Sequence, residues 1–216
     1  MLQSANSTTG DASFQSELLG YLPDHLSAEF DRSTITDSEC RTRTTSPPTG
    51  QPKTLAESSE YCRRLATTHY ENFTVASFLV PRRLRQDFYN IYAFCRWSDD
   101  LADEIAKSEL SLQLLDWWEH EFHRSLHEPA AHPVLLALSE TIHRRQLQPG
   151  LFTDLLIAFR RDQTQHRYQS TEDLLSYCHY SANPVGRIVL NLADCLSPRN
   201  AALSDSICTG LQLSLI

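Results

Sequence analysis

The sequence predicts an all-α fold. Its 216 residues include only six glycines, and neither Asn-Gly nor Asp-Gly, the usual hairpin signal, occurs. No stretch alternates apolar and polar residues as a half-buried strand does, whereas apolar residues recur every three to four positions through much of the chain after residue 54. The length and a hydrophobic content of 41% allow one domain with a sizeable core.

Residues 1–53 are predicted to form a disordered leader ahead of a domain that spans residues 54–216. The leader is rich in Ser, Thr, Asp and Pro and has few large apolar residues. A weak apolar patch from Phe14 to Leu26 is the exception. It suggests a short helix that either docks on the domain or comes from a misplaced start of translation, and we assign it no function.

Order is expected to begin at Thr54, because Thr54 and Glu57 have the spacing of a helix capping box. This first helix runs towards His69, and Pro81 then opens a second, long helix. Three further patterns of helical period cover residues 115–126, 134–142 and 152–159, with Pro133 and Pro149 between them. The predicted domain is therefore a succession of helices.

The last predicted helical region begins with Thr171 as its cap and is interrupted by Pro184, with Gly186 close behind. A proline at this position removes a backbone hydrogen bond and kinks a helix. The small Gly186 lets something approach the backbone. Two interpretations stay open: a ligand lies against this backbone, or the kink only wraps the helix around the core.

Charge and cysteine content exclude several classes of function. A net charge of −8 and a pI near 5.5 argue against nucleic-acid binding, although the basic cluster of Arg82, Arg83 and Arg85 could hold a smaller anion. The six cysteines have no CxxC spacing and are expected to pack as small apolar residues, which indicates a reducing, cytoplasmic environment. No signal peptide or membrane span is predicted. Apolar substrates could still bring the protein to a membrane surface.

The segment from Arg96 to Glu104 is the main candidate for a functional site. On a helix, Asp99 and Asp103 fall one turn apart at the edge of an apolar stripe. Asp100 turns further from the stripe, and Glu104 turns further still towards solvent. Acids near the end of a helix are disfavoured by its dipole and repel each other, so a bound cation, Mg²⁺ by its preference for oxygen ligands, is the favoured explanation. The alternative is a solvated acidic patch.

The predicted stripe and its edge combine apolar, basic and phenolic side chains. Arg85, Tyr92 and Arg96 point nearly the same way as the two acids. The apolar stripe itself consists of Leu84, Phe88, Ile91, Tyr92, Cys95, Ala102 and Ala106.

Three motifs resemble the squalene and phytoene synthase family of head-to-head prenyl synthases. Residues 69–81 are similar to its first motif, and residues 92–104 match its first aspartate-rich motif. Residues 177–187 match a third motif, whose Asn-Pro-Val-Gly form is typical of the hopanoid-pathway branch rather than of phytoene synthases. The similarity extends from about Ala56 to the C-terminus.

This resemblance implies an isoprenoid synthase helical fold around a central apolar cavity, in which Mg²⁺ bridges acidic helices and a substrate diphosphate. Its expected reaction in the hopanoid branch converts presqualene diphosphate to hydroxysqualene without a nicotinamide. The implied catalytic residues are Tyr92, Asp99, Asp103 and Tyr177, with Asp99 and Asp103 as metal ligands. The implied substrate-binding residues are His69, Phe73, Arg85, Arg96, Gly186 and Gln212.

Several of these residues also have a purely structural interpretation. Phe73 and Phe78 could be core side chains, Tyr177 a buried phenol and His69 the cap of a turn. Asp162 follows two arginines; it could face the cavity or could equally pair with one of them, so we leave it out of the predicted site.

The sequence departs from the family at its C-terminal end. The resemblance implies a second acidic helix that opens with a Gln-Leu-x-Asn pattern; Gln212 matches it, but Leu215 stands where the Asn is expected, and two later acids are missing. We therefore expect a truncated synthase that is incomplete at the C-terminus. Two alternatives remain: a noncatalytic remnant that either binds a partner prenyl synthase or has no role, and a phytoene-type synthase, which Asn183 and Pro184 disfavour.

Overall fold

The computed structural model describes residues 10–34, 54–68, 80–165 and 167–215. Every regular element in these ranges is helical, which confirms the predicted all-α fold. The described elements are α1 (Gly10–Leu19), α2 (Asp24–Thr34), α3 (Leu55–Thr68), the 3₁₀ turn η1 (Arg82–Leu84), α5 (Arg85–Asp103), α6 (Ser108–Ser125), α7 (Pro133–Arg145), α8 (Gly150–Thr164), α9 (Thr171–Ser181), α10 (Asn183–Leu192) and α11 (Pro198–Leu213).

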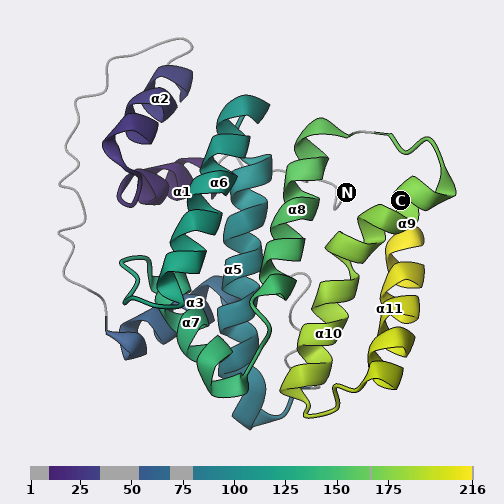
Figure 1. Ribbon diagram of the computed structural model, residues 1–216. Helices are drawn as coiled ribbons and strands as arrows, with labels where there is room; N and C mark the ends of the chain where they lie inside the picture. Colours follow the sequence, from purple (N-terminus) through teal and green to yellow (C-terminus); the bar gives the residue numbers. More distant parts are fainter. Residues whose placement is uncertain (1–9, 35–53, 69–79, 166, 216) are drawn as a thin grey trace.

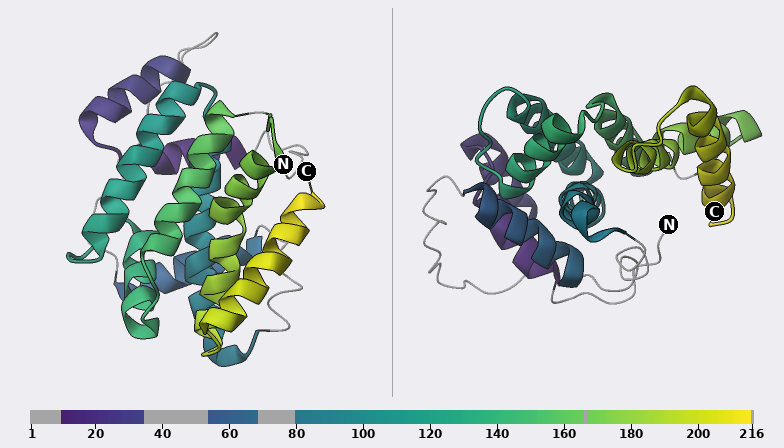
Figure 2. Two further views of the ribbon diagram at one scale, coloured as in Figure 1. Left: turned by 45° about the vertical axis from the view of Figure 1, so that its right-hand side comes forward. Right: turned by 90° about the horizontal axis from the view of Figure 1, so that it is seen from below.

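Helix α5 is the central element of the fold. Helices α3, α6, α7 and α8 all pack against it, and the view along the bundle shows α5 among the other helices (Figures 1 and 2). Helix α10 packs on α8, α9 and α11, so the last three helices form an outer group on one side. None of the described helices has the length and apolar character needed to cross a bilayer.

A cluster of aromatic side chains fills the core around α5. The rings of Phe94 and Trp118 stack at 5.8 Å, and Phe152 lies edge-on to Phe94 at 5.5 Å. The indole N–H of Trp118 donates to the Ser98 hydroxyl at 3.1 Å, so burial leaves this donor satisfied. These residues are almost fully buried, and they fix the rotation of α5 about its axis.

The helix boundaries show which local signals the sequence carries. The Thr54 N–H donates to Glu57 Oε2 at 2.8 Å and the Glu57 N–H donates to Thr54 Oγ1 at 3.2 Å, which confirms the capping box. Thr171 is not the cap of α9; Ser170 caps it by accepting from the Asp173 N–H at 3.1 Å. At Pro184 the chain ends one helix and begins another.

Residues 10–34 are helical, so the prediction of a disordered leader is wrong for this part of the chain. These residues form α1 and α2, which lie beside α5 and α6 in Figure 1. Leu18, Leu22, Leu26 and Phe30 are at most 9% exposed, and the ring of Tyr21 lies 4.3 Å from that of His132. The segment orders because these few apolar residues recur at helical spacing and reach the core, which outweighs the polar composition around them.

The rest of the predicted leader, residues 1–9 and 35–53, lies outside the described residues.

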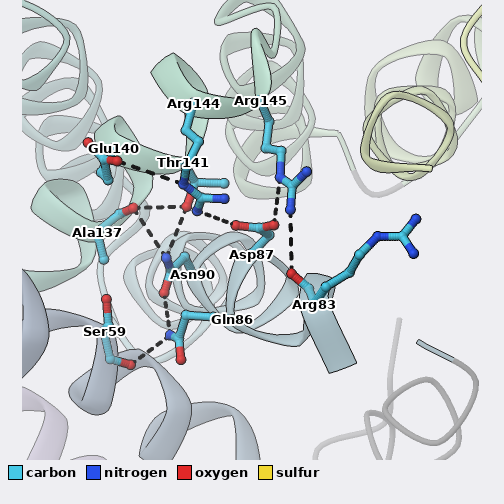
Figure 3. A network of polar contacts seen from close by, with 10 residues as sticks. All are labelled: Ser59, Arg83, Gln86, Asp87, Asn90, Ala137, Glu140, Thr141, Arg144 and Arg145. Carbon is cyan, nitrogen blue, oxygen red and sulfur yellow. Dashed lines mark hydrogen bonds and ion pairs between the residues drawn. The ribbon is translucent and has the colours of Figure 1, made fainter. Parts of the chain in front are cut away.

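A buried polar network joins α3, α5 and α7 (Figure 3). Asn90 donates to the Thr141 hydroxyl at 3.0 Å and accepts from Gln86, which also donates to the Ser59 carbonyl oxygen at 2.8 Å. One turn earlier, the carboxylate of Asp87 is 1% exposed and pairs with arginines of α7. Because each buried group has a partner, the network specifies how the three helices meet.

Candidate functional site

The C-terminal end of α5 carries the predicted acidic site. Asp99 and Asp103 lie one turn apart, and the helix ends at Asp103. The Asp99 side chain is 43% exposed and accepts from Arg96, whose Nη1 lies 3.3 Å from Oδ2. Asp103 is exposed. Two carboxylates and a guanidinium are thus placed at one end of the bundle by a single helix that is held on several sides.

The prediction that Asp100 turns away from the protein is wrong. Asp100 is 6% exposed and forms an ion pair with Arg96. The reason is the rotation of α5, whose buried face includes Phe94, Trp97 and Leu101 rather than the stripe chosen from the sequence. The middle of the predicted stripe is only half-buried, namely Phe88, Ile91, Tyr92 and Cys95.

The carboxyl groups at this end of α5 are crowded and partly desolvated. Burial, followed by the neighbouring charge of Asp103, raises the pKa of Asp99 to about 6, against the opposing effect of Arg96. Burial raises the pKa of Asp100 to about 7, although its pairing with Arg96 acts in the other direction. Burial also raises the pKa of Asp103. A cation bound here would relieve the unfavourable charge that these shifts report.

Asp162 of α8 extends the acidic site, and the sequence prediction omitted it. Its carboxylate accepts a hydrogen bond from the hydroxyl of Tyr177 on α9 at 3.0 Å. Its charge also makes a minor contribution to the raised pKa of Asp99, so Asp162 lies within electrostatic reach of that carboxylate. Tyr168 lies beside this pair, with its ring 5.2 Å from that of Tyr177.

The helical position of Asp162 relative to Arg160 could have indicated that the two side chains do not pair. Arg160 pairs with Asp116 and Glu119 of α6, and Arg161 donates to Ser176 and lies 4.7 Å over the ring of Tyr180. A helical projection of α8 separates Asp162 from Arg160 by about 200°, so the two side chains leave opposite faces. Asp162 is therefore hydrogen-bonded to Tyr177, while Arg160 pairs with acids of α6.

Tyr177 and Tyr92, both predicted to be catalytic, differ in their surroundings. Tyr177 is buried, and burial together with the charge of Asp162 raises the pKa of its phenol, so it stays protonated and donates. Tyr92 is half-buried, and burial raises the pKa of its phenol as well. Arg96 lowers the pKa of Tyr92 and Asp99 raises it, so the Tyr92 side chain lies within electrostatic reach of the acidic end.

Arg85 does not join the acids. It lies in the first turn of α5, about 21 Å along the helix axis from Asp99 at roughly 1.5 Å per residue. Its Nε donates to the Val80 carbonyl oxygen at 3.2 Å, which fixes the turn that leads into α5. The helical projection placed Arg85 on the right face, but it took no account of the distance along the axis.

Gly186 has a structural neighbour where a ligand was predicted. A Cβ at this position would lie 2.2 Å from Ser204 Oγ and 2.6 Å from Cys208 Sγ, both on α11. The glycine thus permits close packing of α10 on α11, and its substrate-binding role stays a prediction. The same interface contains the bidentate pair of Arg187 with Asp205, at 3.0 and 2.5 Å.

The remaining predicted residues are less informative. Gln212 is half-buried in the last turns of α11, which packs on α9 and α10. His69 and Phe73, like Phe78, lie outside the described residues. Two hollows of about 300 and 360 Å³ lie away from the acids, one beside Leu126 and Ile142 and the other beside Arg187.

The acidic site offers oxygen donors of the kind that Mg²⁺ binds. Asp99 and Asp103 supply two carboxylates from one helix, and Asp162 of α8 lies within electrostatic reach of Asp99. Among the described residues, no group of three or more His, Cys, Asp or Glu side chains is placed so that it could hold a metal ion together. This pattern fits a hard cation that takes its other oxygens from water and a substrate phosphate, as Mg²⁺ commonly does.

The family model and the relatives that match this chain point to the same family. The squalene/phytoene synthase profile matches residues 66–216. A hydroxysqualene synthase of Rhodopseudomonas palustris is 37% identical over 153 residues, which are 70% of this chain and 51% of the relative. A phytoene synthase of Arthrospira platensis is 31% identical over 153 residues, covering 71% of this chain and 50% of the relative. The chain thus spans about half the length of these relatives.

Solved structures show the same architecture. The crystal structure of squalene synthase HpnC from Alicyclobacillus acidocaldarius superposes with a TM-score of 0.69 at 48% identity, covering 73% of this chain and 59% of that one. A dehydrosqualene synthase in complex with a ligand superposes with a TM-score of 0.62 at 27% identity, covering 74% and 55% of the two chains. The fold, the acidic motif and the sequence matches agree, and the chain belongs to the squalene/phytoene synthase family.

Proposed function

We propose that this chain carries one acidic side of the diphosphate site of a Mg²⁺-dependent isoprenoid synthase. The observation that carries the proposal is the placement of Asp99 and Asp103 on one turn of the central helix, beside Arg96. Their raised pKa values indicate carboxylates that gain from a bound cation. Membership of the family supports a substrate whose diphosphate group would bind this cation.

The residues around the acids have separate tasks in this proposal. Bound Mg²⁺ would act as a Lewis acid that stabilises the charge of the departing diphosphate. Asp99 and Asp103 would hold the ion, while Arg96, already at the site, would add positive charge beside the leaving group. Tyr177, held by Asp162 and protonated at neutral pH, would direct its phenol towards the same region.

For the substrate we propose presqualene diphosphate, which with one water would yield hydroxysqualene and diphosphate. The support is the hydroxysqualene synthases of Rhodopseudomonas palustris and Zymomonas mobilis, each 37% identical to this chain. A phytoene-type reaction is the alternative within the family, since phytoene synthases also match. The Asn-Pro-Val-Gly motif that begins at Asn183 favours hydroxysqualene formation. In the structure, the Asn183 side chain accepts a hydrogen bond from the Thr209 hydroxyl at 3.1 Å.

A noncatalytic, partner-binding role is the second candidate function. The observation that favours it is the outer face of α11, where Leu203, Ile207 and Leu211 are 55–63% exposed at a spacing of four residues. A regular apolar stripe of this kind is typical of a surface that another chain or segment covers.

Binding and turnover should be measured together, because the chain spans about half the length of its curated relatives. We expect Mg²⁺-dependent binding of presqualene diphosphate in titration calorimetry, and its loss in the Asp99→Asn and Asp103→Asn variants. Asp116→Asn is the matched control, since Asp116 is 71% exposed on α6. Where hydroxysqualene forms, turnover should fall by on the order of 100-fold in Asp99→Asn.

Each outcome of this experiment has a clear meaning. Unchanged binding in both acid variants would contradict the metal proposal. Folded wild-type protein that neither binds nor turns over presqualene diphosphate would instead support the partner-binding candidate. Formation of phytoene-type product from a geranylgeranyl substrate would reassign the reaction within the family.

A further inference from the structure

The end of the molecule opposite to the acids carries a cluster of arginines. Arg82 and Arg83 lie in η1, and Arg85 opens α5. Arg144 and Arg145 end α7 and reach the same place. We call these five residues the arginine cluster. It brings together two segments that are about 60 residues apart in the sequence.

The buried carboxylate of Asp87 binds two of the five arginines. It accepts from Arg144 Nη2 at 2.6 Å and from Arg145 Nε at 2.8 Å. Arg145 Nη2 also donates to the carbonyl oxygen of Arg83 at 3.4 Å. In Figure 3 the side chain of Arg83 extends away from Asp87. Asp87 thus fixes Arg144 and Arg145, and Arg85 is held by its bond to the Val80 carbonyl oxygen, whereas Arg82 and Arg83 lie in the exposed η1 turn beside them.

The charge of this region is opposite to that of the whole protein. The cluster has five positive charges, and the two acids paired with its members are Asp87 and Glu140. The region therefore carries three net positive charges, whereas the whole chain has a net charge of −8. Arg82 and Arg83 are exposed, and the side chain of Arg144 is 45% exposed. An acidic protein with one basic end has a strongly directional field.

We propose that the arginine cluster docks on a membrane surface of anionic phospholipid. Such a surface attracts basic side chains within a Debye length and repels the acidic remainder of the chain, so only one orientation is favoured. The cluster lies at the start of α5 and the acids at its end, so the acidic site would face away from the headgroups. The proposed function adds a reason, because its substrate and product carry long apolar chains, but the charge argument does not depend on it.

The experiment is vesicle co-sedimentation of the full chain without any substrate. Vesicles of phosphatidylcholine with 30% phosphatidylglycerol are compared with vesicles of phosphatidylcholine alone. We expect binding only to the anionic vesicles, and release as salt is raised. In the Arg82→Gln, Arg83→Gln double variant, partitioning should fall about 25-fold, at roughly fivefold per arginine. These two arginines are chosen because Arg144 and Arg145 hold Asp87 and therefore also stabilise the fold.

The control variant changes charge by the same amount elsewhere. Lys107 and Arg167 are exposed and follow the ends of α5 and α8, away from the cluster, so the Lys107→Gln, Arg167→Gln variant should bind nearly as well as the wild type. Equal losses in both double variants would overturn the proposal in favour of a net-charge effect. Failure of the wild type to bind anionic vesicles would overturn it directly. Release by millimolar inorganic diphosphate at constant ionic strength would assign the cluster to soluble phosphates instead.

These outcomes are independent of the proposed reaction. Vesicle binding needs no turnover, and catalytic inactivity of the chain would leave it unchanged. Conversely, an active enzyme that ignores anionic vesicles would refute the docking surface alone.

Discussion

Replacement of Leu18 by alanine tests whether the two N-terminal helices belong to the folded domain. Leu18 is fully buried in α1 and belongs to the same apolar core as the residues of α5 and α6. Truncation of a buried leucine removes its transfer free energy and leaves a cavity, and measured losses run from about 2.7 to 5.0 kcal/mol. Because α1 lies at the edge of the core and can partly relax, we expect about 3 kcal/mol. For a chain of 216 residues that corresponds to a fall of about 6–12 °C in Tm.

The assay is urea unfolding followed by circular dichroism at 222 nm, with thermal unfolding as a second measurement. Leu203→Ala is the matched control, because Leu203 is 55% exposed on α11 and its truncation should change stability by less than about 0.5 kcal/mol. A loss in Leu18→Ala no larger than in the control would refute the reasoning. It would mean that α1 and α2 contribute little to the fold, as the sequence composition alone suggests.

Three further predictions concern other parts of the structure. Asp87→Asn should lower the free energy of unfolding by about 2–3 kcal/mol, because it removes a buried charge that pairs with two arginines. Glu60→Gln, in an exposed pair, should have a much smaller effect, and urea unfolding measures both. Mg²⁺ affinity, measured by calorimetry, should rise between pH 5 and 7 as Asp99, with its pKa of about 6, loses its proton, and a pH-independent affinity would contradict the assignment. Gly186→Leu should destabilise the protein by about 1–3 kcal/mol through its clash with α11, and thermal unfolding unchanged from wild type would show that α11 is displaced without loss.

The pH prediction has a counterpart in stability. The folded-state pKa values of Asp99 and Asp100 are raised above the ordinary value of 3.8, so folding favours their protonated forms. Their contribution to stability is therefore fully present below about pH 4 and is lost as the pH rises through about 6 to 7. In Asp100→Asn the wild-type decrease in stability across this window should become smaller, and an unchanged profile would argue against the burial of this carboxyl group.

Local signals in the sequence predicted much of the fold. The Thr54 and Glu57 box marks the start of α3, and the break at Pro184 separates α9 from α10, because both depend only on residues a few positions apart. The two acids of α5 could be placed on one turn for the same reason. Their metal-binding role stays a prediction.

Other features depend on contacts that local patterns do not contain. Asp87 is buried because Arg144, 57 residues later in the chain, reaches it, and nothing near Asp87 announces that partner. The burial of Asp100 follows from the rotation of α5 against four neighbouring helices, which the apolar stripe suggested incorrectly. Asp162 was discarded on the basis of adjacent arginines, although its partner Tyr177 belongs to the next helix.

The docking of α1 has a consequence for synthesis on the ribosome. Phe14 of α1 packs against Trp97 and Tyr21 packs against His132, so the native contacts of this segment are complete only after about 110 more residues have been made. At a translation rate of about 5–20 residues per second, their apolar side chains stay uncovered for roughly 5–20 s. Throughout that interval the apolar side chains of residues 18–30 are exposed on the nascent chain. We therefore expect chaperones that bind emerging polypeptides to recognise this segment.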